Sequence, residues 1–223
     1  MGKFDWFWKA MGSTTERNNK KSKAVVANAH GLIEELSLLD DASLASAVAS
    51  TVRDGAIADK PRFLAGLSVA SQRTLGMTPF EVQNQAVLRL LEGDVIQMAT
   101  GEGKTLVGAM AATGFALQGK RVHLITVNNY LAARDAEWMR PLVEFFGLTV
   151  AAVTESSTRE ERVTAYRSDV IYAPVTEIGF DHLRDNQITS REQTVQLPAD
   201  VTLVDEADSV LAVSYTHLTL PTN

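Results

Sequence analysis

The hydrophobic residues of the chain follow a helical spacing in its first third and a strand-like spacing afterwards. Between residues 22 and 39, apolar residues recur every three or four positions, which predicts an amphipathic helix. Two more helices are predicted at 42–53 and 61–75, separated by a turn at Asp54-Gly55 and closed by Gly76. We therefore expect a helical N-terminal segment before the main fold.

The next helix has an N-terminal signature of its own. Thr78 is a candidate N-cap, Pro79 suits the first helical position, and Glu81 stands three residues after the cap. This pattern predicts a helix that begins at Pro79, after the Thr78 cap, and runs to Glu92.

Beyond this point, short runs rich in apolar and β-branched residues alternate with helical patterns. The runs predict strands at 94–98, 121–126, 148–153, 169–173 and 200–204. Helices are predicted at 106–117, 130–146 and 176–185, with a capping box at 157–160 opening another. This alternation predicts an α/β fold whose parallel sheet is flanked by helices on both faces. Ligands of such sheets bind at the carboxyl ends of the strands.

One such end carries a glycine-rich turn, TGEGKT, at residues 100–105. Glycines allow the tight turn, and the following helix start adds partial positive charge for phosphate oxygens. Lys104 would reach the β- and γ-phosphates, and the Thr105 hydroxyl would bind Mg²⁺. Met98 stands where the usual phosphate-binding motif has its first glycine. The turn nevertheless predicts a nucleotide site.

A second strand end carries adjacent carboxylates. Asp205 and Glu206 follow the apolar run 200–204. Mg²⁺-assisted phosphoryl transfer needs a carboxylate to hold the metal, for which Asp205 is suited, and one to polarise the attacking water, for which Glu206 is suited. Upstream, the amide of Gln83 offers the donor and acceptor needed to read adenine, although the residue pattern alone favours an exposed polar position on a helix.

Composition and charge narrow the class of protein. The 223 residues are 45% hydrophobic with a formal net charge of −6, so a nucleic-acid binder that relies on overall positive charge is disfavoured. There are no cysteines, hence no disulfide or thiolate metal site. Residues 1–23 combine aromatic and then basic side chains, which suits a segment lying on an anionic membrane surface or against a partner. A chain end whose aromatic side chains pack on the core fits the pattern equally well.

Several motifs together resemble the SecA family of protein-translocating ATPases. They are GMTPFEVQ at 76–83, MATGEGKT at 98–105, VHLITVNNYLAARDAEWM at 122–139, EIGFDHLRDN at 177–186 and VDEADS at 204–209. The resemblance covers residues 20–211 and is specific, and Ala207 together with YAPV at 172–175 looks more like the accessory type of SecA. It implies a RecA-like, DEAD-type nucleotide-binding domain at 77–211, after a helical prefix at 24–76.

The resemblance also implies roles for individual residues. Catalysis would involve Lys104, Asp205 and Glu206, with Thr105 and Asp205 on Mg²⁺. ATP would be bound by Met77, Phe80, Gln83, Gly101, Glu102, Gly103, Lys104, Thr105 and Arg134. Asn129 stands where the family usually has Asp.

The family resemblance implies a cytoplasmic protein, peripheral to the inner face of the cell membrane, whose intact form binds the SecYEG channel and preproteins and can form a homodimer. This chain lacks the preprotein-binding and second nucleotide-binding domains, so weak or absent hydrolysis is expected of it alone. Residues 212–223 depart from the family pattern and are interpreted as a non-native tail. The alternatives are a superfamily 2 nucleic-acid helicase fragment, which the acidic composition disfavours, and a non-catalytic nucleotide-binding module.

Overall fold

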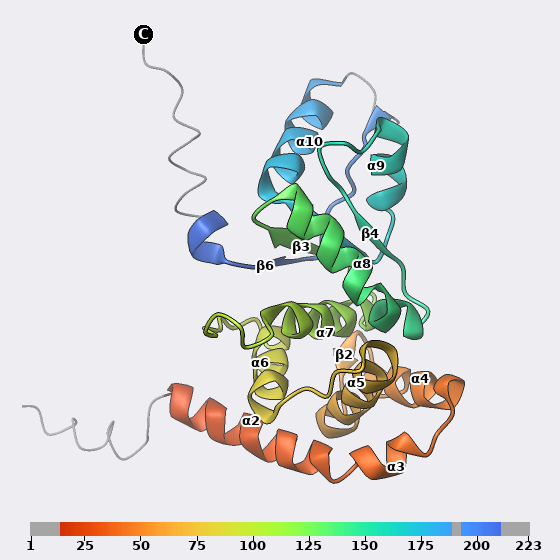
Figure 1. The fold of residues 1–223 in the computed structure, drawn as a ribbon, viewed down its shortest axis with the longest axis vertical. Helices are drawn as coiled ribbons and strands as arrows, with labels where there is room; N and C mark the ends of the chain where they lie inside the picture. The colour runs from red at the N-terminus through yellow and green to blue at the C-terminus, as the bar shows by residue number, and fades with distance from the viewer. Residues whose placement is uncertain (1–13, 189–192, 211–223) are drawn as a thin grey trace, which may run out of the picture. The chain divides into compact units, whose positions relative to one another are not determined.

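The computed structural model describes residues 14–188 and 193–210, and the chain divides into two compact units, residues 1–102 and 103–223 (Figure 1). The first unit is mainly helical. Its elements are α2 (Thr14–His30), α3 (Ile33–Ser37), α4 (Asp41–Ala49), β1 (Val52–Arg53), β2 (Ala56–Ile57), α5 (Lys60–Leu75) and α6 (Glu81–Leu91).

Helix α5 is the centre of the first unit. Its residues from Phe63 to Ser71 are all buried, as expected for a helix that is covered on every side. Helices α2, α3 and α4 all contact it, and α2 also contacts α6. Gly66 allows α4 to approach closely, because a Cβ added there would lie 2.1 Å from Cγ2 of Val48.

Two of the predicted helices in this unit have different bounds from those expected. The helix predicted at 22–39 is two helices, which meet around Gly31-Leu32. The helix predicted at 42–53 ends at Ala49, and its last residues form the antiparallel hairpin β1–β2 around Asp54-Gly55. Both hairpin-turn residues have positive φ, 51° and 72°. A left-handed backbone cannot continue a helix, so the chain turns back there.

Helix α6 also begins two residues later than its sequence signature predicts. Phe80, not Thr78, is the N-cap, and its backbone N–H donates to Oε1 of Gln83 at 2.8 Å. The Thr78 hydroxyl donates instead to the side chain of Gln72 on α5. The side chain of Gln83 therefore makes the capping contact that the sequence pattern predicts for Thr78.

The second unit is an α/β layer structure. A parallel sheet with strand order β4-β5-β3-β6 is formed by β3 (Val122–Thr126), β4 (Val150–Ala152), β5 (Val170–Pro174) and β6 (Val201–Val204). The helices are α7 (Lys104–Leu117), α8 (Asn129–Phe145), α9 (Arg159–Ala165) and α10 (Val175–Gln187). The predicted fold class, a parallel sheet flanked by helices, is confirmed.

Helices cover both faces of this sheet (Figure 1). On one face, Leu124 of β3 meets Gly108 of α7, and α8 lies beside α7 against β5. On the other face, the ring of Tyr166, at the end of α9, lies 5.7 Å from the ring of His123. A cluster on that side also includes Ile171 and Ala173 of β5. The strands β3 and β5 are buried throughout, as expected of central parallel strands.

Two further local predictions are wrong, one in each unit. Residues 94–98 form no strand, and Val95 is 97% exposed. An apolar run becomes a strand only where a neighbouring strand pairs with it, and none in the described chain does so here. The capping box lies one residue later than predicted, with Thr158 as N-cap and Glu161 as its partner.

Two terminal predictions lie outside the described residues: the aromatic part of the N-terminal segment, and the tail at 212–223. Among the helices that are described, none is long and apolar enough to cross a membrane.

Candidate functional site

In the first unit, the glycine-rich turn is folded onto α6. Gly101 has φ 85°, and the Glu102 carboxylate accepts a hydrogen bond from the backbone N–H of Ala99 at 2.7 Å. Gln83 is 6% exposed, and its Nε2 donates to the Glu102 carbonyl at 2.8 Å. The structure thus brings the predicted adenine reader Gln83 directly against the predicted phosphate loop.

The contacts of Gln83 constrain how it could read a base. Its Oε1 accepts from Phe80 N–H and its Nε2 donates to Glu102, so the acceptor and one donor of its amide are already engaged. Adenine recognition would therefore use the remaining amide hydrogen or exchange one of these bonds. Phe80 is 72% exposed and available to pack on a ring. Met77 is half-buried, and its carbonyl accepts from the Ser71 hydroxyl at 2.7 Å.

In the second unit, α7 begins where the phosphate turn ends. Gly103 is its N-cap with φ 78°, a left-handed conformation that favours glycine. Lys104 and Thr105 are the first two residues of the helix and are half-buried. The unpaired N–H groups and dipole of this 14-residue helix therefore provide a partial positive charge beside Lys104.

The acidic pair lies just beyond the carboxyl end of β6. The backbone N–H of Asp205 donates to the Ile125 carbonyl of β3 at 2.9 Å, which fixes its position at the sheet edge. Burial raises the pKa of Asp205 and the negative charge of Asp135 adds to this, whereas the Glu206 backbone N–H and the charges of Lys104 and Arg134 lower it. The structure thus places Asp205 within electrostatic range of Lys104.

Glu206 has a left-handed backbone with φ 53°, which is uncommon for a residue with a side chain. Such conformations carry a strain on the order of 1 kcal/mol and concentrate at functional sites. The Glu206 side chain is exposed, so it is free to contact a ligand or water.

Arg134 is accompanied by a carboxylate that the sequence analysis did not identify. Its Nε and Nη2 atoms lie 2.7 and 2.6 Å from Oδ1 of Asp135, which is buried. Arg134 also lies over the ring of Tyr130, 5.8 Å from its centroid. Asp135 belongs to the buried face of α8 together with Ala132, Ala136 and Met139. A carboxylate at an apolar position of a helix is a signal that could have been found in the sequence.

These residues fit a nucleotide and Mg²⁺. A helix N-terminus with a left-handed glycine and a lysine offers donors for phosphate oxygens. Thr105 and Asp205 supply the hydroxyl and carboxylate oxygens that Mg²⁺ accepts as ligands. The structure assembles these groups in two sets, one in each unit: Met77, Phe80, Gln83, Gly101 and Glu102 in the first, and Gly103, Lys104, Thr105, Arg134, Asp205 and Glu206 in the second.

A second group of charges lies on the opposite face of the sheet. The buried Arg162 guanidinium donates to Glu177 at 2.7 Å and to Asp181 at 2.8 Å, and to two backbone carbonyls, those of Thr154 and Ser157. The Tyr166 hydroxyl also donates to Asp181 at 2.8 Å. Arg184 of α10 also pairs with Asp181 at 2.8 Å, so two arginines balance the two carboxylates, and we interpret the group as a structural link between α9 and α10.

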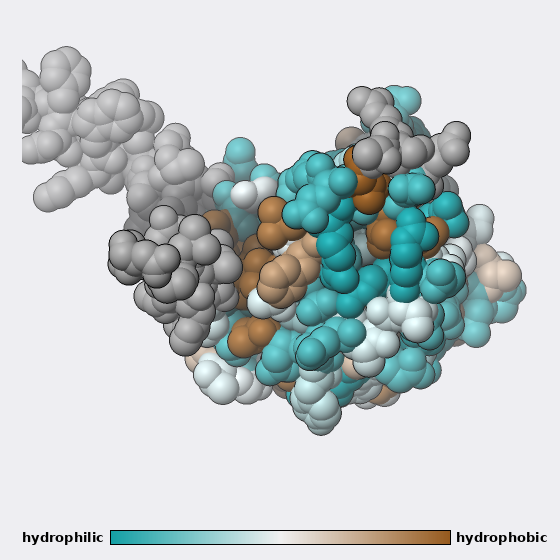
Figure 2. All heavy atoms as spheres, turned by 90° about the horizontal axis from the view of Figure 1, so that it is seen from above, coloured by the Kyte–Doolittle hydropathy of each residue, from teal (hydrophilic) through white to brown (hydrophobic). Residues whose placement is uncertain are grey.

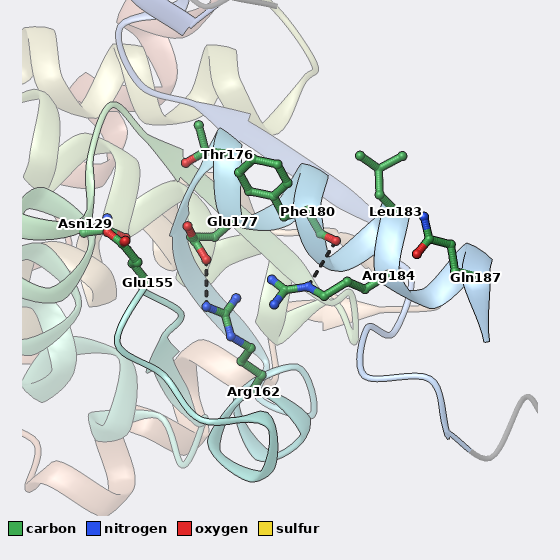
Figure 3. Close-up of a pocket in the computed structure, with 9 residues that line it drawn as sticks. All are labelled: Asn129, Glu155, Arg162, Thr176, Glu177, Phe180, Leu183, Arg184 and Gln187. Carbon is green, nitrogen blue, oxygen red and sulfur yellow. Dashed lines mark hydrogen bonds and ion pairs between the residues drawn. The ribbon is translucent and has the colours of Figure 1, made fainter.

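A hollow of about 710 Å³ lies over this link, between α9, α10 and the start of α8 (Figure 3). Arg162 and Glu177 point toward one another in it, and Phe180 and Leu183 come from α10. Asn129 lines it too, and its Oδ1 accepts from the backbone N–H of Glu155 at 3.0 Å. None of the predicted nucleotide residues lines this hollow.

The surface around α10 is of mixed polarity. Phe180 and Leu183 are 55% and 57% exposed. The view from above shows separate hydrophobic patches among mostly hydrophilic atoms (Figure 2). Scattered exposed apolar side chains of this kind are ordinary on soluble surfaces.

Comparisons with known proteins give a consistent result. Residues 7–214 match the family described as the SecA DEAD-like domain. The chain is 62% identical over 211 residues to a protein translocase subunit SecA 2 of Corynebacterium efficiens, covering 95% of this chain and 28% of that protein. It is 51% identical over 207 residues to SecA 3 of Mycolicibacterium vanbaalenii and to SecA 2 of Mycobacterium leprae, covering 92% of this chain in both comparisons. The chain thus spans 26–28% of the length of these relatives.

Proposed function

The chain belongs to the SecA DEAD-like domain family, and we propose that it is the ATP-binding part of a SecA-type motor that couples ATP hydrolysis to preprotein export. The family match spans residues 7–214, and the relatives named SecA 2 support the accessory type. The observation that carries the proposal is the position of Asp205, at a sheet edge within electrostatic range of Lys104 and Arg134. A carboxylate opposite a phosphate-binding lysine is the arrangement that a metal-bound triphosphate requires.

Each candidate residue has a role in this proposal. Lys104 and the N–H groups that begin α7 hold the phosphates, and Thr105 and Asp205 hold Mg²⁺, whose positive charge neutralises the phosphate oxygens. Glu206 orients the attacking water, and Arg134, held by Asp135, lies beside the nucleotide.

In this proposal, residues of the first unit contact the adenine and form the beginning of the glycine-rich turn. Gln83, with Phe80 and Met77 near it, contacts the base, while Gly101 and Glu102 form the turn that Gly103 completes. The domain assignment is part of the proposal, with a helical prefix at 24–76 and the nucleotide-binding domain at 77–211.

Hydrolysis by this chain alone is expected to be slow. An arginine supplied from outside a P-loop domain accelerates hydrolysis by roughly 10³ to 10⁵ in other NTPases. The relatives are more than three times as long as the matched region, and the family resemblance implies that such an arginine lies in a second nucleotide-binding domain. We therefore propose binding with little turnover for residues 1–223.

The partners of the intact protein follow from the family. The proposal includes the SecYEG channel, preprotein substrates, an anionic membrane surface and a homodimer, in a cytoplasmic protein peripheral to the inner face of the membrane. Exposed Lys20, Lys21 and Lys23 near the start of α2 supply positive charge suited to such a surface. No nucleic acid is expected.

A binding experiment tests the nucleotide assignment. The 223-residue chain should bind fluorescent ADP in the presence of Mg²⁺, and Lys104→Ala should weaken the affinity at least tenfold because a charge-assisted phosphate contact is lost. Lys120→Ala is the matched control, since Lys120 lies over the Phe115 ring at the other end of α7 and should not matter. Equal affinities of the two variants would refute the phosphate role of Lys104.

A hydrolysis experiment separates the motor from the helicase alternative. ATP turnover by this chain should be slow and unchanged by single-stranded RNA. Strong stimulation by RNA would support the helicase alternative instead.

A further inference from the structure

The glycine-rich turn is closed by hydrogen bonds among its own residues. The backbone N–H of Glu102 donates to the carbonyl of Ala99 at 3.3 Å, which makes residues 99–102 a β-turn. Gly101 occupies the third position of this turn, and its φ of 85° has the positive sign that a type II turn requires there. The closed turn therefore follows from the placement of a glycine at position 101.

The Glu102 side chain folds back onto the same turn. Its Oε2 atom accepts a hydrogen bond from the backbone N–H of Ala99 at 2.7 Å, although both residues are exposed. Hydrogen bonds to a charged acceptor are shorter and stronger than neutral ones, so this contact holds the carboxylate against the turn. The N–H groups of Ala99 and Glu102 thus both have acceptors within the turn.

A third contact fixes the backbone at Glu102. Its carbonyl accepts from Nε2 of Gln83, whose side chain is 6% exposed and whose Oε1 accepts from the N–H of Phe80. The turn is thereby attached to the start of α6. Because Gln83 holds the backbone of Glu102, the exposed carboxylate can leave Ala99 by rotation about its own side-chain bonds.

The contact between Glu102 and Ala99 competes with phosphate binding. A glycine-rich turn holds phosphate oxygens through its backbone N–H groups, and here a carboxylate already accepts from one of them. Carboxylate and phosphate oxygens are both anionic acceptors, so they compete for the same donors and repel one another at close range. The side chain of Glu102 therefore opposes a phosphate at this turn.

We propose that the Glu102 side chain is an internal competitor that lowers the affinity of the glycine-rich turn for the phosphates of a nucleotide. The carboxylate leaves Ala99 when phosphate binds, and the turn keeps its bond to Gln83. The proposal rests on the proposed function, since it needs this turn to hold phosphate. It goes further by giving the side chain a role in setting the affinity, whereas the family resemblance implies only that Glu102 belongs to the ATP site.

Two substitutions at Glu102 test the proposal through the binding of fluorescent ADP with Mg²⁺. Glu102→Gln removes the charge but keeps an oxygen that can accept from Ala99, and Glu102→Ala removes both. The affinity should rise about threefold in Glu102→Gln and about tenfold in Glu102→Ala, because a larger fraction of the turns is open to phosphate. Inorganic pyrophosphate, measured by displacement of the fluorescent ADP, should gain by the same factors, since the effect lies at the phosphates and not at the base.

Glu34→Gln is the matched control, because it removes one exposed carboxylate from the same unit, on α3. It changes the net charge of the chain as Glu102→Gln does, and it should leave both affinities unchanged. Hydrogen exchange without nucleotide tests the contact itself. The amide of Ala99 should exchange faster in Glu102→Ala than in the wild type, because it loses its acceptor.

Three results would overturn the proposal and leave the proposed function intact: ADP binding that is unchanged or weaker in both Glu102 variants, a gain of affinity for ADP without one for pyrophosphate, and an equal gain in Glu34→Gln. Equal exchange of the Ala99 amide in Glu102→Ala and in the wild type would overturn it as well, whatever the affinities. If neither the wild type nor Glu102→Ala binds ADP or pyrophosphate, the proposed function fails together with this inference.

Discussion

His123 should make the stability of this chain sensitive to mild acid. It lies in the central strand β3, is 4% exposed, and its Nε2 is without a hydrogen-bond partner among the described residues. Burial and, to a smaller extent, the charge of Arg121 lower its pKa from 6.5 to about 4. The substitution His123→Phe keeps a flat ring against Tyr166 and removes the titrating imidazole.

The direction of the effect follows from proton linkage. Between pH 6.5 and 4, the unfolded chain binds a proton at His123 and the folded chain does not, so stability falls as the pH falls through this window. Above pH 6.5 both states are neutral and the effect vanishes. At about 1.4 kcal/mol for each pKa unit, the full loss is roughly 3 kcal/mol at pH 4.

Urea unfolding followed by circular dichroism measures this effect. The free energy of unfolding of wild type minus that of His123→Phe should become more negative by roughly 2–3 kcal/mol between pH 7.5 and 4.5. Carboxylates titrate in both proteins, so their contribution cancels in the difference. His182→Gln, an exposed position on α10, is the control and should leave the difference flat. A pH-independent difference for His123→Phe would refute the conclusion that His123 is neutral in the folded protein.

Three further predictions test the packing. Arg162→Met should lower the free energy of unfolding by about 3–5 kcal/mol in chemical denaturation, since the buried Glu177 loses its cation and Asp181 keeps only the exposed Arg184 and the Tyr166 hydroxyl. A loss below about 1 kcal/mol would show that the link is not structural. Gly66→Ala should lower the free energy of unfolding by about 1–3 kcal/mol, because its Cβ would overlap Val48. Val48→Ala should recover part of this loss in the double variant. If the losses of the two single variants simply add in the double variant, the contact is contradicted. Asn129→Asp keeps the oxygen that accepts from Glu155 N–H, so the melting temperature should change little, whereas Asn129→Leu should lower it.

Much of the second unit could be predicted from residue patterns. Four of the five predicted strands are present within two residues of their expected bounds, because short apolar runs between turn signals have few alternatives when helices cover both sheet faces. The helix around Tyr130 and the one around Phe180 are likewise present. The glycine-rich turn at 100–105 and the Asp205-Glu206 pair stay predictions as parts of a nucleotide site, and they could be singled out because their expected chemistry depends on adjacent residues.

The errors arise where the outcome depends on the partner that another segment supplies or fails to supply. Thr78 has the correct chemistry for a cap, yet it bonds Gln72, and the cap is made by Gln83. Residues 94–98 have the composition of a strand but no pairing neighbour in the described chain. Local sequence cannot choose between such partners, because the choice depends on what other segments bring near.

Residue patterns alone predicted the order of strands and helices in the second unit, and they singled out the glycine-rich turn and the acidic pair, since each depends on spacing within one segment. Which distant residues come together depends on the tertiary fold. Asp135, Tyr172 and Asp205 lie on α8, on β5 and just after β6, and their mutual influence depends on the strand order and on which face each helix covers. Sheet order is set by burial and pairing across the whole unit, so the surroundings of the Asp205 carboxylate emerge only when the strands are assembled.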